Sequence, residues 1–192
     1  MFKVFEDYLS EKISLSPQDF ELIQSVAVIK KLRKHQYLLQ EGDIWTYKAF
    51  VCQGLLRSFR TDDKGVDHII QFSIENWWAG DIESGSLGHP SKNNIEALEP
   101  TTLLLFSSKD FEMLETKIPV FKDFVTALIS QSYIASQNRV HDNISMNSEE
   151  RYSKFLKTYP QIANRVPQHM IASYLGISAE TLSRIRKQIQ KK

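Results

Sequence analysis

The stretch that decides the fold is QHMIASYLGISAETLSRIRKQ, residues 168–188. Two short helices that cross steeply need apolar side chains on their facing sides, and this stretch places them at Ile171, Leu175, Ile177, Leu182 and Ile185. Ala172 supplies a small side chain where the helices approach, and Gly176 supplies the positive φ of a tight turn. The pattern predicts a helix-turn-helix motif, with an unrelated helical hairpin as the alternative.

The predicted second helix has a polar outer face. Ser178 is placed to cap the helix, and the residues that point away from its apolar side are Ala179, Glu180, Thr181, Ser183, Arg184 and Lys187. In the major groove of DNA an arginine can donate two hydrogen bonds to guanine, and a glutamate can accept one from cytosine. Phosphates would repel Glu180, the single acid in this basic segment, so we interpret it as a base-reading residue.

Glu180 and Arg184 are four positions apart and therefore share one face of the predicted helix. We predict that both contact base edges and that the arginine holds the glutamate in place. A helix-surface ion pair worth about 0.2–0.5 kcal/mol is the alternative. Thr181, Arg186 and Lys187 are predicted to contact phosphates, which set the register on DNA but carry no sequence information.

Charge is distributed unevenly along the chain, although its formal net charge is only +1. Residues 151–192 hold nine Lys or Arg and one Glu, whereas residues 1–150 hold 15 Lys or Arg and 22 Asp or Glu. A basic segment that can fold compactly favours a polyanionic partner, either nucleic acid or a membrane surface.

Composition narrows the class of protein. A chain of 192 residues with 42% hydrophobic residues can bury one good core or two smaller ones. The lone Cys52 excludes an internal disulfide, an iron–sulfur cluster and a zinc ribbon, and it is expected to fill space in a strand. We find neither a signal peptide nor a run of membrane-spanning length, and we expect a cytoplasmic protein.

Short segments with a period of two occupy the first half of the chain, separated by glycines and the turn TDDKG. They cover residues 36–43, 47–54, 55–65, 68–74, 93–99 and 101–107. Six strands at this spacing predict an antiparallel roll or barrel. A helix is expected before them, with Ser16 as its cap and Pro17 at its first position.

A long helix follows the strands. Pro119 can begin it, and apolar or small residues recur at steps of three and four as far as Ile144. A helix of this length, with a stripe longer than a small roll could cover, favours pairing with a second copy; packing on the roll is the alternative. We expect the next helix to begin at Asn147 or Ser148 and to end before Pro160.

This order of elements, with the motif ISAETLSRIRK at residues 177–187, resembles the Crp/Fnr family of bacterial transcription regulators over nearly the whole chain. YLLQEGDIWTYKAFVCQGLLRSFRTDDKG, residues 37–65, is similar to the start of that family's roll. The resemblance implies an α+β fold, with a cyclic-nucleotide-binding-like antiparallel β-roll, a long dimerisation helix and a C-terminal helix-turn-helix domain. Their expected ranges are 1–117, 118–146 and 147–192.

The resemblance also implies partners and roles. A homodimer paired through residues 118–146 would bind double-stranded DNA and act with RNA polymerase. In the Fnr branch a glutamate, a serine and an arginine read a TGA-containing half-site, and these roles fall here on Glu180, Ser183 and Arg184.

The effector is not identified by the sequence. Family members that bind cyclic nucleotide have a Gly-Glu pair and then an arginine for the phosphate, and here Gly80 and Asp81 are followed by Ser91 at the arginine position. Lys92 lacks the two-pronged fit of arginine, so cyclic AMP is not expected. The candidate residues of a pocket for an unknown effector are Trp77, Trp78, Gly80, Asp81 and Lys92, and ordinary core packing of the tryptophans is the alternative.

Other classes of function are less well supported. The five histidines, at residues 35, 68, 89, 141 and 169, form no metal-ligand or haem-ligand pattern, and we find no phosphate loop, nucleophile elbow or catalytic carboxylate pair. The sequence therefore predicts a homodimeric, sequence-specific DNA-binding regulator and not an enzyme. A ligand-binding or protein-interaction module with a vestigial helix-turn-helix is the alternative.

Overall fold

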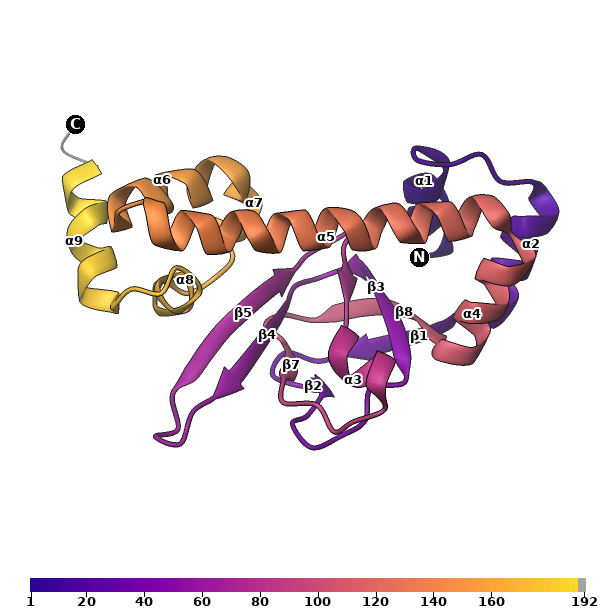
Figure 1. Cartoon of the computed structure of the whole chain (residues 1–192), viewed down its shortest axis with the longest axis horizontal. Coiled ribbons are helices and arrows are strands. Elements are labelled where there is room, and N and C mark those ends of the chain that lie inside the picture. The colour runs from indigo at the N-terminus through magenta and orange to yellow at the C-terminus, as the bar shows by residue number, and fades with distance from the viewer. Residues whose placement is uncertain (190–192) are drawn as a thin grey trace. The chain divides into compact units, whose positions relative to one another are not determined.

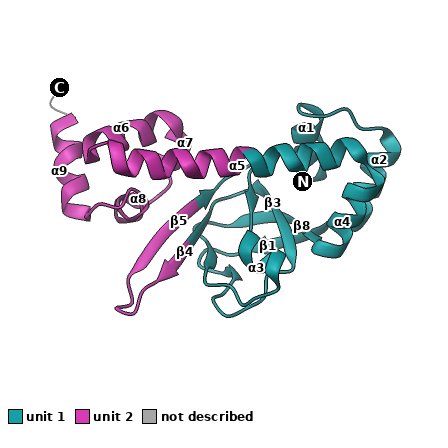
Figure 2. Cartoon of the chain, viewed as in Figure 1, with its two compact units in different colours: residues 1–58, 72–130 teal, residues 59–71, 131–192 magenta. Residues whose placement is uncertain are grey.

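The computed structural model describes residues 1–189 (Figure 1). They form two compact units (Figure 2). We call residues 1–58 and 72–130 the roll unit, and residues 59–71 together with the chain from residue 131 onward the C-terminal unit. The break falls inside the long helix, whereas the predicted domain boundaries follow the ends of that helix and stay a prediction.

The strands form two four-stranded sheets. The first has the order β1-β8-β3-β6, with β1 (Val28–Leu32), β8 (Thr101–Ser107), β3 (Tyr47–Gln53) and β6 (Trp78–Ala79). The second has the order β2-β7-β4-β5, with β2 (Tyr37–Leu39), β7 (Asn94–Ala97), β4 (Leu56–Thr61) and β5 (Asp67–Ser73). The pairs β1–β8, β3–β8, β3–β6 and β2–β7 are antiparallel, as the sequence predicts for a roll.

Alternation along β3 supplies the two cores of the roll unit. Ala49 and Val51 point into the core between the sheets, whereas Phe50 and Cys52 point into a second core on the other face. Cys52 is buried there and unpaired, as a space-filling residue would be.

Helices cover that second face with aromatic side chains. They are α1 (Phe2–Ser10), α2 (Pro17–Val26), α4 (Ser108–Lys117) and the first part of α5 (Pro119–Ser145). The predicted start of α2 is confirmed, because the Ser16 side chain accepts the Asp19 N–H and Pro17 is the first helical residue. Pro119 also begins α5 as predicted.

The C-terminal unit is a small helical bundle with the tip of the β4–β5 hairpin. Its helices are the second part of α5, α6 (Ser148–Thr158), α7 (Pro160–Ala163), α8 (Gln168–Tyr174) and α9 (Ala179–Ile189). Asn147 caps α6 in a reciprocal pair with Glu150, which confirms the predicted cap. The fold class expected from the sequence is thereby confirmed, with a roll, a long helix and C-terminal helices.

The structure adds elements that the sequence did not predict: α1, β1, β6, the short helix α3 (Ile82–Leu87) and α7. The prediction of six strands was therefore wrong, since the described residues form eight. Across residues 1–189, no helix combines the length and the hydropathy that a membrane crossing requires.

Candidate nucleic-acid interface

The turn between α8 and α9 has the geometry of a Schellman cap. Gly176 lies at φ 65°, its N–H donates to the Ser173 carbonyl at 3.0 Å, and the Ile177 N–H donates to the Ala172 carbonyl at 3.0 Å. These bonds satisfy the last carbonyls of α8 and fix the direction in which the chain enters α9. The predicted role of Gly176 is confirmed.

Helix α9 is capped and anchored as the sequence predicts. The Ser178 hydroxyl accepts the Thr181 N–H at 3.1 Å. Leu182 and Ile185 are buried. Ile171 of α8 and Leu175, the residue that caps the C-terminal end of α8, are buried as well. Since one side of α9 is held by these apolar contacts, its other side must face outward.

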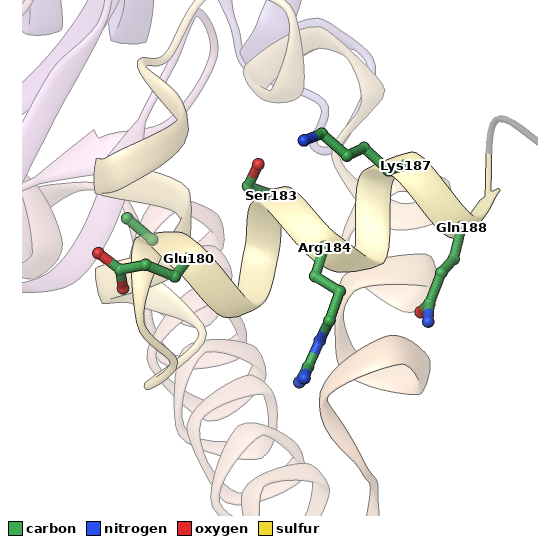
Figure 3. A pocket seen from close by; sticks show the side chains of 6 residues that line it. Glu180, Ser183, Arg184, Lys187 and Gln188 are labelled. Atoms are coloured by element: carbon green, nitrogen blue, oxygen red, sulfur yellow. The ribbon is translucent and has the colours of Figure 1, made fainter.

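The outward side is a shallow hollow of about 580 Å³ (Figure 3). Its lining residues are Ala179, Glu180, Ser183, Arg184, Lys187 and Gln188, and all six are exposed. The three predicted base-reading residues, Glu180, Ser183 and Arg184, are thus brought together on one surface. The sequence analysis missed Gln188, whose spacing of four residues from Arg184 was the available signal.

Glu180 is held by the start of its own helix. Hydrogen bonds from its backbone N–H and from the Ser178 hydroxyl lower the pKa of the Glu180 carboxyl. Within residues 1–189 no ion pair joins it to Arg184, and the two side chains leave the helix in different directions (Figure 3). The expectation that the arginine holds the glutamate is therefore corrected.

The predicted phosphate-contacting residues do not form one group. Lys187 is exposed and lies in the hollow beside the base-reading candidates. Thr181 and Arg186 are half-buried outside it, and the Thr181 hydroxyl lies 3.1 Å from the Ser178 hydroxyl. Of the three predicted residues, Lys187 is therefore the exposed one.

The predicted effector-pocket residues face different surroundings within the roll unit. Trp78 packs among the aromatic rings of the helix-covered core, with ring centroids 5.4 Å from Phe50 and 5.6 Å from Phe111. The main chain of its neighbour Trp77 donates to the Ile74 carbonyl and accepts from the Val51 N–H, and these bonds fix the turn into β6. Lys92 is exposed, 3.8 Å from Glu83. Trp78 thus serves core packing, which the sequence analysis gave as the alternative to an effector pocket.

Asp81 is the buried polar centre of this region. Its Oδ2 accepts hydrogen bonds from the Ser91 hydroxyl at 2.6 Å and the Asn93 amide at 2.8 Å, and its Oδ1 accepts the Ser84 N–H at 3.1 Å. Burial by itself raises the pKa of the Asp81 carboxyl, but these hydrogen bonds outweigh it and leave the pKa below its usual value. The carboxylate is therefore satisfied by its own chain.

Gly80 is required where it stands. A Cβ at this position would lie 2.6 Å from Nε1 of Trp45, so any larger residue would displace the tryptophan. The glycine that resembles the first residue of a nucleotide cassette thus has a packing role here. Within residues 1–189, no group of three or more His, Cys, Asp or Glu side chains is arranged to hold a metal ion.

Comparison with known proteins places the chain. Residues 29–116 match the family model described as the cyclic nucleotide-binding domain. Over 93% of its length the chain is 24% identical to the anaerobic regulatory protein of Haemophilus influenzae, covering 73% of that protein. In sequence the chain is thus similar to transcription regulators of the Crp/Fnr type.

Solved structures of Crp/Fnr regulators share the fold. The structure of FixK2 from Bradyrhizobium japonicum superposes with a TM-score of 0.76 at 20% identity, over 86% of this chain and 85% of that one. A putative transcriptional regulator of the Crp/Fnr family from Eubacterium rectale gives a TM-score of 0.69 at 17% identity, over 92% of this chain and 84% of that one. The likeness therefore extends beyond the roll to the C-terminal helices.

Proposed function

We propose that this chain is a Crp/Fnr-type regulator and binds duplex DNA in a sequence-specific manner through α9. The observation that carries the proposal is the exposed polar face of α9, whose opposite face is anchored by Leu182 and Ile185. A helix held on one side and polar on the other can enter the major groove without unfolding any part of its bundle.

The base-reading roles are assigned to Glu180, Ser183 and Arg184. Arg184 is exposed and can offer its fork of donors to guanine O6 and N7. The lowered pKa of Glu180 keeps it an acceptor, as hydrogen bonding to cytosine N4 requires. Lys187, on the same surface, supplies a phosphate contact.

The active species is proposed to be a homodimer paired along α5. Large apolar side chains on this helix are exposed, and they are Ile129, Tyr133, Ile134, Val140 and Ile144. Ile144 is 83% exposed, which is costly for an isoleucine unless a partner covers it. Steps of four, seven and four from Ile129 through Tyr133 and Val140 to Ile144 give the seam of a helix pair.

Cyclic nucleotide is not the proposed effector. A cyclic phosphate needs a buried cation, but the arginine position is occupied by Ser91, and Lys92 extends into solvent. The acid that would hold a ribose hydroxyl, Asp81, is already saturated by Ser84, Ser91 and Asn93. The residues present therefore do not fit the ligand for which the domain family is named, and any effector is of another class.

RNA polymerase is the proposed further partner. No catalytic substrate is proposed.

Salt-dependent DNA binding tests the proposal. The probe is a labelled duplex with an inverted repeat of TGA-containing half-sites, compared with a scrambled duplex by fluorescence anisotropy. We expect the repeat to be preferred and affinity for both duplexes to fall steeply as salt rises, because bound cations release counterions from phosphates. Binding that ignores both sequence and salt would identify a protein-interaction module with a vestigial motif instead.

A further inference from the structure

The tip of the β4–β5 hairpin belongs to the same compact unit as the helix-turn-helix (Figure 2). Residues 59–71 are continuous in sequence with the roll, yet 104 positions of chain separate Ile69 from the α8 residue that it contacts. The contact is made of specific polar bonds, and base reading does not by itself require any of them.

The Ser173 hydroxyl forms the centre of this contact. It accepts the Ile69 N–H at 3.0 Å and donates to the Asp67 carbonyl at 3.0 Å. These groups lie two residues apart on β5, the end strand of its sheet among the described residues. One hydroxyl thus bonds to the same pair of groups that a neighbouring strand would engage.

Arg139 makes a second, independent contact. From α5 its guanidinium donates a hydrogen bond to the Ile70 carbonyl and lies 5.1 Å above the ring of Tyr174. That ring in turn lies 5.6 Å from Phe155 of the bundle core. The hairpin tip is therefore fastened to α5 and to the last turn of α8.

The position of Ser173 links this contact to the reading helix. Its side chain binds the hairpin, while its carbonyl accepts the Gly176 N–H of the cap that directs the chain into α9. The hairpin leaves the reading surface free, since Glu180, Ser183 and Arg184 remain exposed. A shift of the hairpin would therefore move the α8–α9 turn first and α9 after it.

We propose that Ser173 and Arg139 are positioning residues for DNA recognition, which pin the β4–β5 hairpin to the helix-turn-helix and hold α9 in its DNA-competent arrangement. The inference rests on the proposed function. The hairpin is a continuous extension of the roll strands, so it is, besides α5, a covalent route by which a change in the roll can reach the helix-turn-helix.

The first test measures the pin without DNA. Ser173→Ala leaves the Ile69 N–H without its acceptor, and we expect its hydrogen exchange in the full-length protein to accelerate on the order of tenfold. The matched control is Ser153→Ala on α6, because within residues 1–189 the Ser153 side chain makes no hydrogen bond. Unchanged exchange at Ile69 would overturn the pin.

The second test measures its effect on recognition with the TGA inverted-repeat duplex and the scrambled one. Ser173→Ala should weaken binding of both about five- to tenfold and leave the ratio between them unchanged, because the base-contacting side chains are intact. Arg139→Lys keeps the charge but loses the planar stacking on Tyr174, and should act in the same direction. Ser153→Ala should bind as the unmodified protein does.

The outcomes separate the two proposals. Faster exchange at Ile69 with unaltered DNA affinity would overturn the positioning role. A protein that binds neither duplex would overturn the proposed function and the positioning role with it, while the exchange experiment would still decide whether the pin exists. If Ser173→Ala does not fold, Arg139→Lys carries the DNA-binding measurement, and unaltered affinity in that variant would overturn the positioning role.

Discussion

At the scale of single residues, the proposed DNA contacts of α9 come from side chains that differ in reach and chemistry. Arg184 presents a planar fork that can match one base edge, whereas Lys187 is a point charge with three rotating donors. Both are exposed on the same hollow, so position alone does not separate their roles. Substitution of each residue by alanine distinguishes the two roles.

Arg184→Ala is expected to cost about 1–3 kcal/mol of binding free energy and to relax the preference at one base pair. Lys187→Ala should weaken binding to every sequence alike and reduce the salt slope by about one. Affinities across a panel of half-site variants measure both effects. Identical profiles for the two variants would contradict the division of roles.

Asp81 provides a prediction for stability in the roll unit. Asp81→Asn removes a buried charged acceptor that binds Ser84, Ser91 and Asn93, and should lower the free energy of unfolding at pH 7 by about 1–3 kcal/mol. The Asp81 pKa in the folded protein lies below its ordinary value of 3.8. The stabilisation is therefore complete above pH 3.8 and is lost as the pH falls through the lower folded pKa.

Urea unfolding of the unmodified protein and of Asp81→Asn between pH 7 and pH 3 measures this difference. Ser86→Ala, an exposed substitution on the same short helix α3, is the control. A difference in unfolding free energy between the unmodified protein and Asp81→Asn that grows toward low pH would contradict the assignment.

At the scale of elements, the α8–α9 turn could be predicted from sequence because each of its residues has one geometric duty. Gly176, Ser178 and the apolar pair Leu182 and Ile185 appear at fixed offsets, and the structure places all of them as expected. The strands β1 and β6 could not be predicted in this way. Only Leu32 of β1 is buried, so it lacks a period-two pattern, and β6 is two residues long.

The sequence also could not predict the surroundings of the effector-pocket candidates or the hydrogen-bond partner of Glu180. The sequence shows that Trp78 and Asp81 are close along the chain, but Trp78 lies in β6 and packs on the helix-covered core, whereas Asp81 caps α3 and lies in a hydrogen-bond network. For Glu180, helical spacing favoured Arg184 as the partner, while the free N–H groups at the start of α9 were nearer competitors.

Gly176→Ala tests the turn. A Cβ there meets no atom within 4 Å, so the expected cost of about 1–2 kcal/mol comes from the left-handed backbone alone. Gly176→Asn should cost less, since asparagine tolerates that conformation better. Thermal unfolding of the two variants gives the order, and an equal cost for both would show that the backbone conformation is not what the glycine provides.

At the scale of the whole molecule, the exposed stripe on α5 is the proposed dimer contact, which would bring two helix-turn-helix motifs together on one DNA site. Val140→Lys and Ile144→Lys should each shift the protein from dimer toward monomer in sedimentation velocity experiments, because two charges would face each other across the seam. Asn138→Lys, an exposed change on the same helix away from the stripe, should leave the dimer intact. Unaltered sedimentation of the stripe variants would place the dimer contact elsewhere.

Loss of the dimer should also reduce DNA affinity. Two linked heads gain from each other's binding, so a monomer should lose on the order of a hundredfold or more in apparent affinity for a paired site while keeping its preference within one half-site. Binding of the α5 variants to duplexes with one and two half-sites separates these contributions.

The central claim is that a dimer reads DNA with the exposed face of α9. Selection of bound duplexes from a random pool by the full-length protein tests it most directly. We predict enrichment of an inverted repeat whose half-sites lie about 34 Å apart, one turn of DNA, with the preference at one base pair lost in Arg184→Ala. Failure to enrich any sequence, or enrichment that Arg184→Ala and Glu180→Ala leave unchanged, would contradict the claim.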